Sequence, residues 1–337
     1  MASVVEEAKH ISIPLYEDIL ARIKSRYPRR GGVEGEIAKL QTVYNIAISK
    51  TEDVARLEKL LSRLHPFYWR LVEIEFDRRA VEEAFKCLSK ARRIARRLWE
   101  RYRYSILASR DVREARRVSA EGRGRMLSLF KRCGRRLELL RSLTVFLQRL
   151  PTINPEEPTV IVAGPPNVGK STFVRSVSTA KPEVADYPFT TKQVTVGHRA
   201  YGFTRIQIID TPGLLDRPLE EMNQIERRAV AALMELKGVI LFLADPTRNA
   251  YMSLERQVKL ARDIASITGG RGVYVGVNKC DIAEEQDVER VVELFTKLKE
   301  EGVVVEVYRL SAVNSVEASR VLDDIVRRSR LVGGAGG

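Results

Sequence analysis

Hydrophobic residues over the first 150 positions recur at helical spacing, and few of them gather into the short apolar runs typical of strands. Gly31-Gly32 and His65-Pro66 interrupt this pattern, as helix ends do. The predicted helices cover about 15–26, from about 33 past 47, from about 51 to 64, and from 67 through 76 to about 88. The pattern therefore predicts an all-helical bundle domain over residues 1–150.

A further amphipathic helix is predicted from Ala91 onward. Its apolar face is formed by Ala91, Ile94, Ala95, Leu98, Tyr102, Ser105, Ile106 and Ser109. Its opposite face carries Arg92, Arg93, Arg96, Arg97 and Arg103. We expect a break at Gly122 and Gly124, and a last helix from there to about Leu150.

The second half of the chain alternates short β-rich runs with helical stretches. A linker with three prolines is predicted at 151–158, and a flexible glycine-rich tail at 331–337. The predicted strands are 160–163, 194–200, 205–210, 239–244, 273–277 and 303–310. This alternation predicts a doubly wound, mostly parallel α/β sheet over 159–330, with ligand loops at the carboxyl ends of its strands.

Charge is distributed unevenly between the two halves. The formal charge is +14, and residues 86–149 alone hold 20 lysines and arginines against 5 acidic residues. A solvated helix face is the ordinary explanation of such a run, but the few acidic partners favour binding of a polyanion. RNA is the favoured partner and acidic membrane lipid the alternative. Trp99 and Tyr104 could stack on bases, whereas we expect Tyr102 in the core.

Composition predicts a soluble protein. No apolar run approaches the roughly 20 residues that span a bilayer, and the first residues lack a basic start with an apolar stretch. We expect a cytoplasmic monomer without stable membrane association. The chain has three cysteines, Cys87, Cys133 and Cys280, an odd number without metal-ligand spacing. We therefore expect reduced thiols, no disulfide and no zinc site.

One motif predicts a phosphate-binding loop. Residues 164–172 read Gly-Pro-Pro-Asn-Val-Gly-Lys-Ser-Thr directly after an apolar run. In such a loop backbone N–H groups and a helix N-terminus surround the anion, the lysine reaches the outer phosphates, and the serine hydroxyl ligates Mg2+. The predicted nucleotide contacts here are Asn167, Val168, Gly169, Lys170, Ser171 and Thr172.

Later motifs predict the base and the switch segments. Asn278, Lys279 and Asp281 follow a strand, and a carboxylate there accepts two hydrogen bonds from guanine that adenine does not offer. A backbone N–H of Ser311, Ala312 or Val313 would meet guanine O6. The second switch, Asp210, Thr211, Pro212 and Gly213, supplies a Mg2+ carboxylate and an N–H for the γ-phosphate. The first switch contains Phe189, Thr190 and Thr191.

These positions predict GTP and GDP as ligands with Mg2+ as cofactor. Ser171, Thr191 and Asp210 are the predicted metal ligands, and Lys170, Thr191 and Gly213 the catalytic contacts. Leu214 stands where many GTPases have a water-orienting Gln, so slow intrinsic hydrolysis is expected. Another group, a partner or a bound ion would then have to orient the attacking water. Asn167 suggests K+, unless its side chain only braces the loop.

With these residues the chain resembles the nucleolar GTP-binding protein family, the Nog branch of the Obg-like GTPases. The segment 187–191 is similar to the first switch of Obg-like proteins, which implies that Thr191 is a Mg2+ ligand. The segments 65–69, 122–125 and 150–153 look like the helical preface of the Nog branch, and Leu214 agrees with its lack of the Gln. We expect a compact, archaeal-type member, because members from nucleated cells have a long C-terminal extension.

The resemblance implies a factor in assembly of the large ribosomal subunit, whose helical domain binds rRNA and whose partner is a precursor of that subunit. Two other interpretations stay open. One is a signalling or trafficking GTPase whose helical domain recruits a protein or an acidic membrane surface. The other is a module that holds GTP without hydrolysing it, which Leu214 allows.

Overall fold

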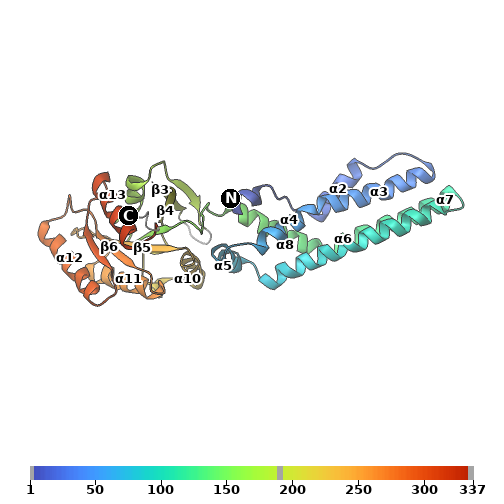
Figure 1. Ribbon diagram of the computed structural model, residues 1–337. Coiled ribbons are helices and arrows are strands. Elements are labelled where there is room, and N and C mark those ends of the chain that lie inside the picture. Colours follow the sequence, from blue (N-terminus) through green and yellow to red (C-terminus); the bar gives the residue numbers. More distant parts are fainter. Residues whose placement is uncertain (1–3, 188–192, 333–337) are drawn as a thin grey trace. The chain divides into compact units, whose positions relative to one another are not determined.

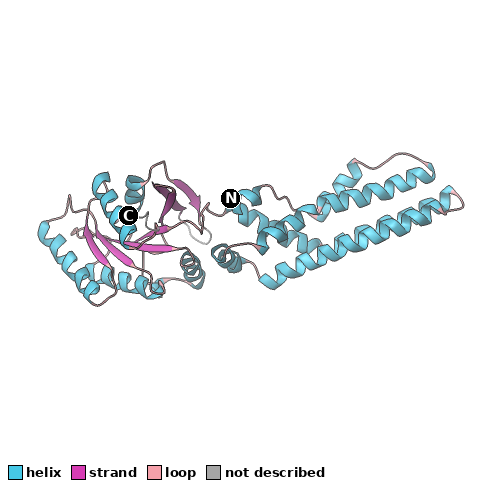
Figure 2. Ribbon diagram, viewed as in Figure 1, coloured by secondary structure: helices cyan, strands magenta, loops and turns pink. Residues whose placement is uncertain are grey.

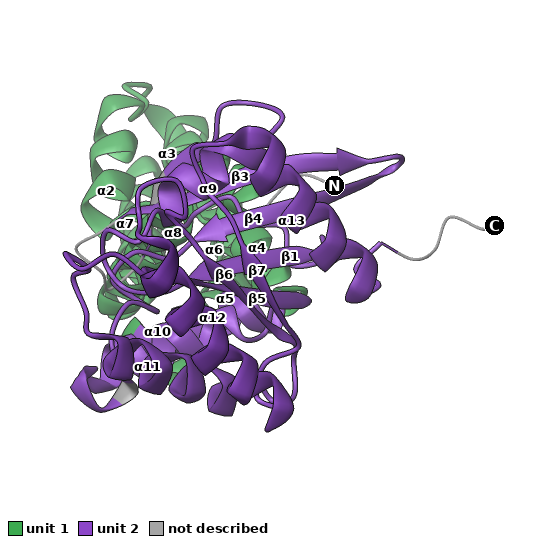
Figure 3. Ribbon diagram, turned by 90° about the vertical axis from the view of Figure 1, so that its left-hand side faces the viewer, with its two compact units in different colours: residues 1–64, 75–149 green, residues 65–74, 150–337 purple. Residues whose placement is uncertain are grey.

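The computed structural model describes residues 4–187 and 193–332 and divides the chain into two compact units (Figures 1 and 3). The helical unit comprises residues 1–64 and 75–149, and the α/β unit comprises 65–74 and 150–337. The predicted domain boundary is therefore corrected in one place, because residues 65–74 of the predicted bundle belong to the α/β unit. None of the helices in the described ranges is long and apolar enough to cross a bilayer.

The helical unit has no strand in its described part (Figure 2). Its core lies where α3, α6 and α7 pack on one another, and Leu40, Leu88 and Phe130 are fully buried there. Its helices are α1 (Val4–Lys9), α2 (Tyr16–Ser25), α3 (Gly32–Lys50), α4 (Glu52–Ser62), α6 (Arg78–Leu107), α7 (Val112–Arg132) and α8 (Gly134–Arg149).

The predicted helix through Phe76 is broken, because a new helix starts at Arg78. The Asp77 carboxylate accepts a hydrogen bond from the Ala80 N–H at 2.7 Å and so caps α6. From this cap α6 continues for 30 residues, which joins the end of one predicted helix to the arginine-rich helix that follows it.

The predicted break at Gly122 and Gly124 is wrong, because α7 runs through both residues. A Cβ atom at Gly122 would lie 2.7 Å from Cγ of Tyr102 and 3.1 Å from Cδ1 of Leu40. The missing side chain therefore lets α7 approach α6 and α3 closely. A Cβ atom at Gly124 would meet nothing within 4 Å. Tertiary packing here outweighs the roughly 1 kcal/mol that a helical glycine costs relative to alanine.

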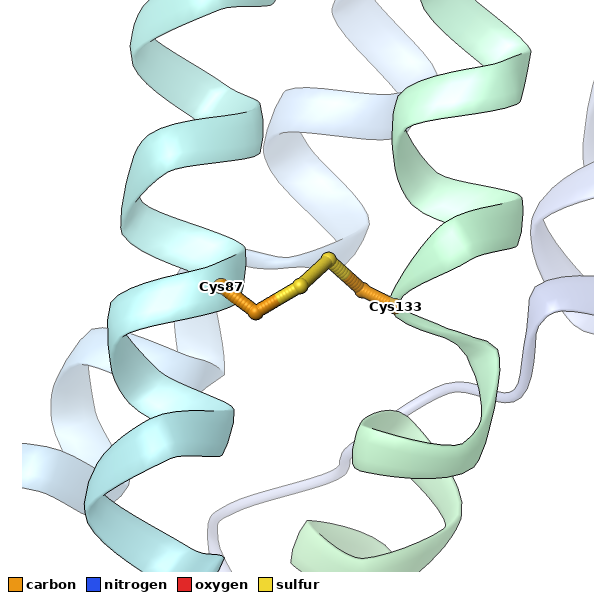
Figure 4. The surroundings of a disulfide bond; sticks show 2 residues. All are labelled: Cys87 and Cys133. Atoms are coloured by element: carbon orange, nitrogen blue, oxygen red, sulfur yellow. A yellow bond between two sulfur atoms is a disulfide. The ribbon is translucent and has the colours of Figure 1, made fainter.

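A disulfide joins Cys87 of α6 to Cys133, the residue between α7 and α8 (Figure 4). The expectation of reduced thiols is thus wrong for these two cysteines, and only Cys280 stays free. The pair is 46 positions apart in sequence, and the hairpin of α6 and α7 between them returns the chain to within 6.2 Å between the two Cα atoms. Sequence spacing does not reveal that return.

The α/β unit is a seven-stranded sheet in the order β2-β3-β4-β1-β5-β6-β7, and the predicted fold class is confirmed. The pairs from β4 through β1 to β7 are parallel, and β2–β3 and β3–β4 are antiparallel. Its strands are β1 (Thr159–Ala163), β2 (Glu183–Asp186), β3 (Gln193–Tyr201), β4 (Thr204–Asp210), β5 (Gly238–Ala244), β6 (Val273–Val277) and β7 (Glu306–Arg309). Strand β2 was not predicted, because it is an edge strand without an apolar run.

The helices of the α/β unit lie between its strands along the chain, except that α5 precedes α6 and α13 follows the last strand. They are α5 (Pro66–Glu75), α9 (Lys170–Val177), α10 (Gln224–Leu233), α11 (Leu254–Ile267), α12 (Glu285–Glu300) and α13 (Ser315–Arg328), with a short 3-10 helix, η1 (Leu219–Glu221). A buried cluster that includes Phe173, Leu241 and Leu322 joins α9 and α13 to the sheet. The carboxyl ends of the parallel strands are thereby fixed, and the predicted site loops follow these ends.

Helix α5 is joined to this unit by hydrogen bonds of a buried tyrosine. Phe67 and Leu71 are fully buried, and the buried Tyr68 hydroxyl donates hydrogen bonds to the carbonyls of Ile153, at 2.5 Å, and Pro151, at 3.4 Å. Both acceptors lie just before β1. Helix α5 is therefore hydrogen-bonded to the segment that directly precedes β1.

Candidate nucleotide-binding site and basic surface

The loop between β1 and α9 has a backbone that only a few residue types can follow. Gly164 and Gly169 have φ angles of 132° and 101°. A Cβ atom would lie 2.3 Å from the Leu243 carbonyl at Gly164, and 2.4 Å from Asn278 Nδ2 at Gly169. Asn167 also has a positive φ, 63°, and is exposed at the loop. Glycine is thus required at both ends of the predicted phosphate loop.

Lys170 begins α9 and folds back over this loop. Its side chain is buried, and Nζ donates to the carbonyl oxygens of Gly164 and Pro165, each at 2.8 Å. The ammonium group is therefore held at the loop, beside the first turn of α9. A positive charge next to a helix N-terminus makes this place suited to an anion.

Ser171 and Asp210 come together at the adjacent strand ends. The Ser171 hydroxyl donates to Oδ2 of Asp210, and the other carboxylate oxygen, Oδ1, is buried without a hydrogen-bond partner. Burial raises the pKa of Asp210, although the Ser171 hydrogen bond and the Lys170 charge act against that rise. A buried carboxylate oxygen without a partner is suited to a hard cation.

Mg2+ fits this pair as one part of a shared coordination sphere. Among residues 4–187 and 193–332 no group of three or more His, Cys, Asp or Glu side chains could hold a metal ion alone. Mg2+ is commonly bound by one or two protein oxygens together with phosphates and water. Ser171 and Asp210 match that pattern.

The second switch contains an acidic residue that the sequence analysis missed. Gly213 donates its N–H to Oδ2 of Asp216 at 2.8 Å, and Asp216 is buried. The N–H predicted for the γ-phosphate is thus already bonded to an anionic group. Leu214 is fully buried, and the Thr211 hydroxyl donates to the Val162 carbonyl at 3.1 Å. An acidic residue three positions after a turn glycine was the available signal for Asp216.

Asn278 connects the predicted base loops to the phosphate loop. Its Nδ2 donates to the Val168 carbonyl at 2.7 Å, and its Oδ1 accepts from the Ala312 N–H at 2.7 Å. One buried amide therefore fixes three predicted contact segments relative to one another. Asp281 and Val313 are exposed at these loops, where a base could approach.

Two more acidic residues support the base loops and were not predicted. Lys279, with a φ of 64°, donates from Nζ to the buried Asp245 carboxylate at 2.5 Å. Ser311 donates its N–H to Glu317 of α13 at 2.9 Å. Asp245 directly follows a predicted strand, and this position was the available signal for it.

The structure brings most predicted nucleotide contacts together at one edge of the sheet. The loop after β1 carries Asn167, Val168, Gly169, Lys170, Ser171 and Thr172, and the loop after β4 carries Thr211, Pro212 and Gly213. Phe189, Thr190 and Thr191 lie outside the described residues.

Two of the five predicted RNA-binding arginines are engaged within the helical unit. Arg92 donates to the Ile48 carbonyl at 3.1 Å and to the Thr51 hydroxyl at 3.2 Å. The Tyr44 side chain raises the pKa of the exposed Arg96. Trp99 stacks on the same tyrosine, with ring centroids 5.5 Å apart. Arg92 and Trp99 therefore have partners within the helical unit, and their roles in RNA binding stay a prediction. Tyr102 is buried, as expected.

A different set of cations on α6 is exposed, and we call it the cationic row. Its members are Lys86, Lys90, Arg93, Arg97 and Arg101. Their spacing of four, three, four and four residues keeps them within about 80° of one helix face. None of the five forms an ion pair within the described parts of the chain. Tyr104, which is 69% exposed, continues the row, whereas the exposed Arg103 lies to one side.

Comparison with known proteins identifies relatives of both units. Residues 13–154 match the model of the NOG1 N-terminal helical domain, and residues 159–279 match that of the 50S ribosome-binding GTPase. Nucleolar GTP-binding protein 1 of Caenorhabditis elegans is 37% identical over 72% of this chain and 36% of its own length. Its Saccharomyces cerevisiae counterpart is 29% identical over 93% of this chain and 49% of its own length.

This chain thus spans less than half the length of these two relatives. A crystal structure of a putative nucleolar GTP-binding protein 1 from Plasmodium falciparum is 32% identical, with a TM-score of 0.46 over 54% of this chain and 90% of that one. The predicted cytoplasmic location is corrected by the same comparison, because the relatives are named as nucleolar proteins.

Proposed function

We propose that the chain, which belongs to the nucleolar GTP-binding protein (Nog) family of GTPases, is a GTP-driven switch in assembly of the large ribosomal subunit. The α/β unit binds and hydrolyses GTP, and the helical unit holds rRNA of a subunit precursor. The proposal rests above all on one observation: a row of exposed cations without acidic partners in a chain that also builds a phosphate loop.

GTP binding uses groups that are already positioned. Lys170 exchanges its two carbonyl contacts for the outer phosphates, and the N-terminus of α9 faces the same anion. Asn278 keeps the phosphate and base loops in register, so that the exposed Asp281 carboxylate pairs with guanine. Mg2+ would be held by Ser171 and Asp210, and when bound it neutralises phosphate charge. Thr191 is the proposed third ligand.

The γ-phosphate competes with a carboxylate for the second switch. Gly213 can donate its N–H to the γ-phosphate only after it leaves Asp216. Since the two acceptors are both anionic, the presence of the γ-phosphate favours a different arrangement of residues 213–216. This exchange gives the GTP and GDP states different structures at the start of the segment that leads to α10.

Slow hydrolysis follows from Leu214. Its buried side chain can neither donate nor accept a hydrogen bond, so it cannot orient the attacking water. We propose that a potassium ion near Asn167, or a group of the ribosomal partner, supplies this function. GTP turnover measured in potassium and in sodium buffer, with and without large ribosomal subunits, separates these two sources.

RNA binding is assigned to the cationic row. The five cations extend along about 22 Å of α6 at 1.5 Å per residue. Phosphates along an RNA strand can replace the missing acidic partners of this row and release bound counterions. Tyr104 offers an exposed ring on which a base can stack at the end of the row.

The decisive experiment is sedimentation of the protein with large ribosomal subunits, with a non-hydrolysable GTP analogue compared with GDP. Analogue-dependent co-migration supports the proposal. A triple variant, Lys90→Gln with Arg93→Gln and Arg97→Gln, should lower the slope of log affinity against log salt by about 2, at roughly 0.7 per lost phosphate contact.

A matched variant removes three cations that already have acidic partners. Arg116→Gln, Arg125→Gln and Arg141→Gln change the net charge equally, because these arginines pair with Glu36, Glu121 and Asp18. Equal losses in both triple variants would contradict the assignment to the row. Absence of co-migration in either nucleotide state would favour a signalling or trafficking GTPase with a protein or membrane partner.

A further inference from the structure

We propose that α5 transmits the nucleotide state of the α/β unit to the RNA-binding helix α6. This inference rests on the proposed function and adds the element that couples its two activities. Helix α5 precedes α6 along the chain but belongs to the other unit (Figure 3). Such a segment is a physical connection between the site that binds GTP and the helix that carries the cationic row.

Helix α5 is attached to two different parts of the α/β unit. The Tyr68 hydroxyl donates to the carbonyls of Ile153 and Pro151, just before β1, and this end of the contact is buried. On its other side, the Arg70 guanidinium is hydrogen-bonded to Glu235, two residues after α10. Helix α5 therefore bridges a fixed part of the sheet and the helix that follows the second switch.

The first switch is also connected to α10. Tyr187 is the first residue of the predicted first-switch segment, 187–191; it is buried and donates from its hydroxyl to the Ala229 carbonyl of α10 at 3.1 Å. Burial raises the pKa of Tyr187, and the nearby Tyr68 hydroxyl adds to that rise. The first residue of the predicted first switch therefore contacts α10, the helix that follows the second switch along the chain.

The contact between α5 and α10 leaves room for movement. A cavity of about 360 Å³ is lined by Arg70 of α5 together with residues of α10 and its surroundings, among them Val230, Met234 and Ile267. A fully packed interface resists displacement, because protein interiors are as dense as organic crystals. The space beside Arg70 is open, although most of the apolar residues of α5 are buried.

The connection from α5 to α6 is short. Helix α5 ends at Glu75 and α6 begins at Arg78, so only Phe76 and Asp77 separate them. Asp77 caps α6, and the ring of Phe76 packs on Phe146 of α8 with centroids 5.5 Å apart. This short covalent connection is the proposed route from α5 to α6.

Insertion of Gly-Gly between Phe76 and Asp77 tests the connection and keeps the contacts of α5. The readout is the ratio of dissociation constants for large ribosomal subunits in GDP and in the non-hydrolysable analogue. For the unmodified protein we expect a ratio of about fivefold or more. The insertion should bring it below about twofold while GTP affinity without subunits stays unchanged. The same insertion between Gly269 and Gly270, an exposed turn after α11, should keep the full ratio.

A substitution pair addresses the contact itself. Arg70→Gln removes the ion pair to Glu235, and Arg205→Gln removes a similarly exposed ion pair, to Glu157, elsewhere in the unit. We expect only Arg70→Gln to reduce the ratio. If the insertion and Arg70→Gln both retain the ratio of the unmodified protein, α5 is not the coupling element and the proposed function still stands. If the unmodified protein itself shows no nucleotide dependence, the proposed switch fails first.

Discussion

The α/β unit and the cationic row of the helical unit differ in how their charges are paired. In the α/β unit cations pair locally, as Arg205 does with Glu157 and Arg328 does with Asp324. The five cations of the row have no ion pair within the described residues, although each of them lies three or four positions from another cation of the row. Self-repulsion along the row therefore remains until an external anion relieves it.

The contrast extends to how each unit would meet its ligand. The GTP site uses a few buried groups with defined partners, such as the Asn278 amide and the Asp210 carboxylate. The cationic row uses exposed side chains on a single helix. Ligand recognition in the α/β unit should therefore depend on single atoms, and recognition in the helical unit on the number of charges.

The largest expected effect is on guanine recognition. Asp281→Asn should weaken GTP binding by about 1000-fold, roughly 4 kcal/mol, because the amide cannot accept both guanine hydrogen bonds. Xanthosine triphosphate should bind instead, since xanthine has a carbonyl where guanine has its amino group. Titration with a fluorescent nucleotide measures both. Asp287→Asn, on the neighbouring α12, is the control, and equal losses in the two variants would disprove the assignment.

The next effect concerns the helical unit alone. Reduction of the Cys87–Cys133 bond, or Cys133→Ser, should lower the free energy of unfolding of this unit by about 2 to 4 kcal/mol. The fluorescence of Trp99 in α6 reports this transition, and Trp69 in α5 reports on the α/β unit. Cys280→Ser should leave both transitions in place. An unchanged Trp99 transition under dithiothreitol would show that the bond does not stabilise the unit.

A smaller effect distinguishes the two glycines of α7. Gly122→Ala should destabilise the helical unit by about 1 to 3 kcal/mol, because the new methyl group collides with the Tyr102 ring. Gly124→Ala should stabilise it by about 0.5 to 1 kcal/mol, since its Cβ meets nothing and alanine favours the helix. Urea unfolding followed at Trp99 measures both. The same sign for both variants would contradict the close contact of α6 with α7.

The smallest effect is a pH dependence in the α/β unit. Burial alone would raise the pKa of Asp324, but hydrogen bonds from Tyr308, Arg327 and Arg328 lower it to about 2. The ordinary value is 3.8, so the folded state gains stability above that pH and loses it as the pH falls from about 4 to 2.

Asp324→Asn should therefore flatten the loss of stability between pH 4 and pH 2, measured by urea unfolding followed at Trp69. The exposed Glu289→Gln variant should retain the full loss. A steep acid transition that survives Asp324→Asn would assign the effect to other carboxylates.

Motifs predicted the backbone geometry of the candidate GTP site, because they encode local structure. The glycines at 164 and 169 and the asparagine at 278 meet contacts that exclude most other side chains, and each follows directly from its place after a strand. The strands themselves were visible as apolar runs. Asp216 escaped prediction because its function depends on one hydrogen bond to Gly213, which no spacing rule specifies.

Features of the helical unit that depend on tertiary contact could not be predicted in this way. Gly122 and Gly124 cannot be told apart by their local sequence. Only the position of the Tyr102 ring makes glycine necessary at 122. A helical projection placed Arg92 on the outer face, but it does not show the Ile48 carbonyl that the guanidinium reaches. The apolar face of α5 suits a bundle or a sheet equally well, so its unit could not be inferred from sequence.

The disulfide has one more consequence, for the covalent topology of the chain. Because it joins Cys87 to Cys133, all of the row except Lys86 lies inside a closed ring of backbone. A protease that cuts once between these cysteines leaves two peptides still joined through sulfur. Such a cut is invisible on a gel without reductant, and with reductant it yields two fragments. The segment between the two cysteines, which carries four of the five cations, can thus be cut once and stay attached through the disulfide.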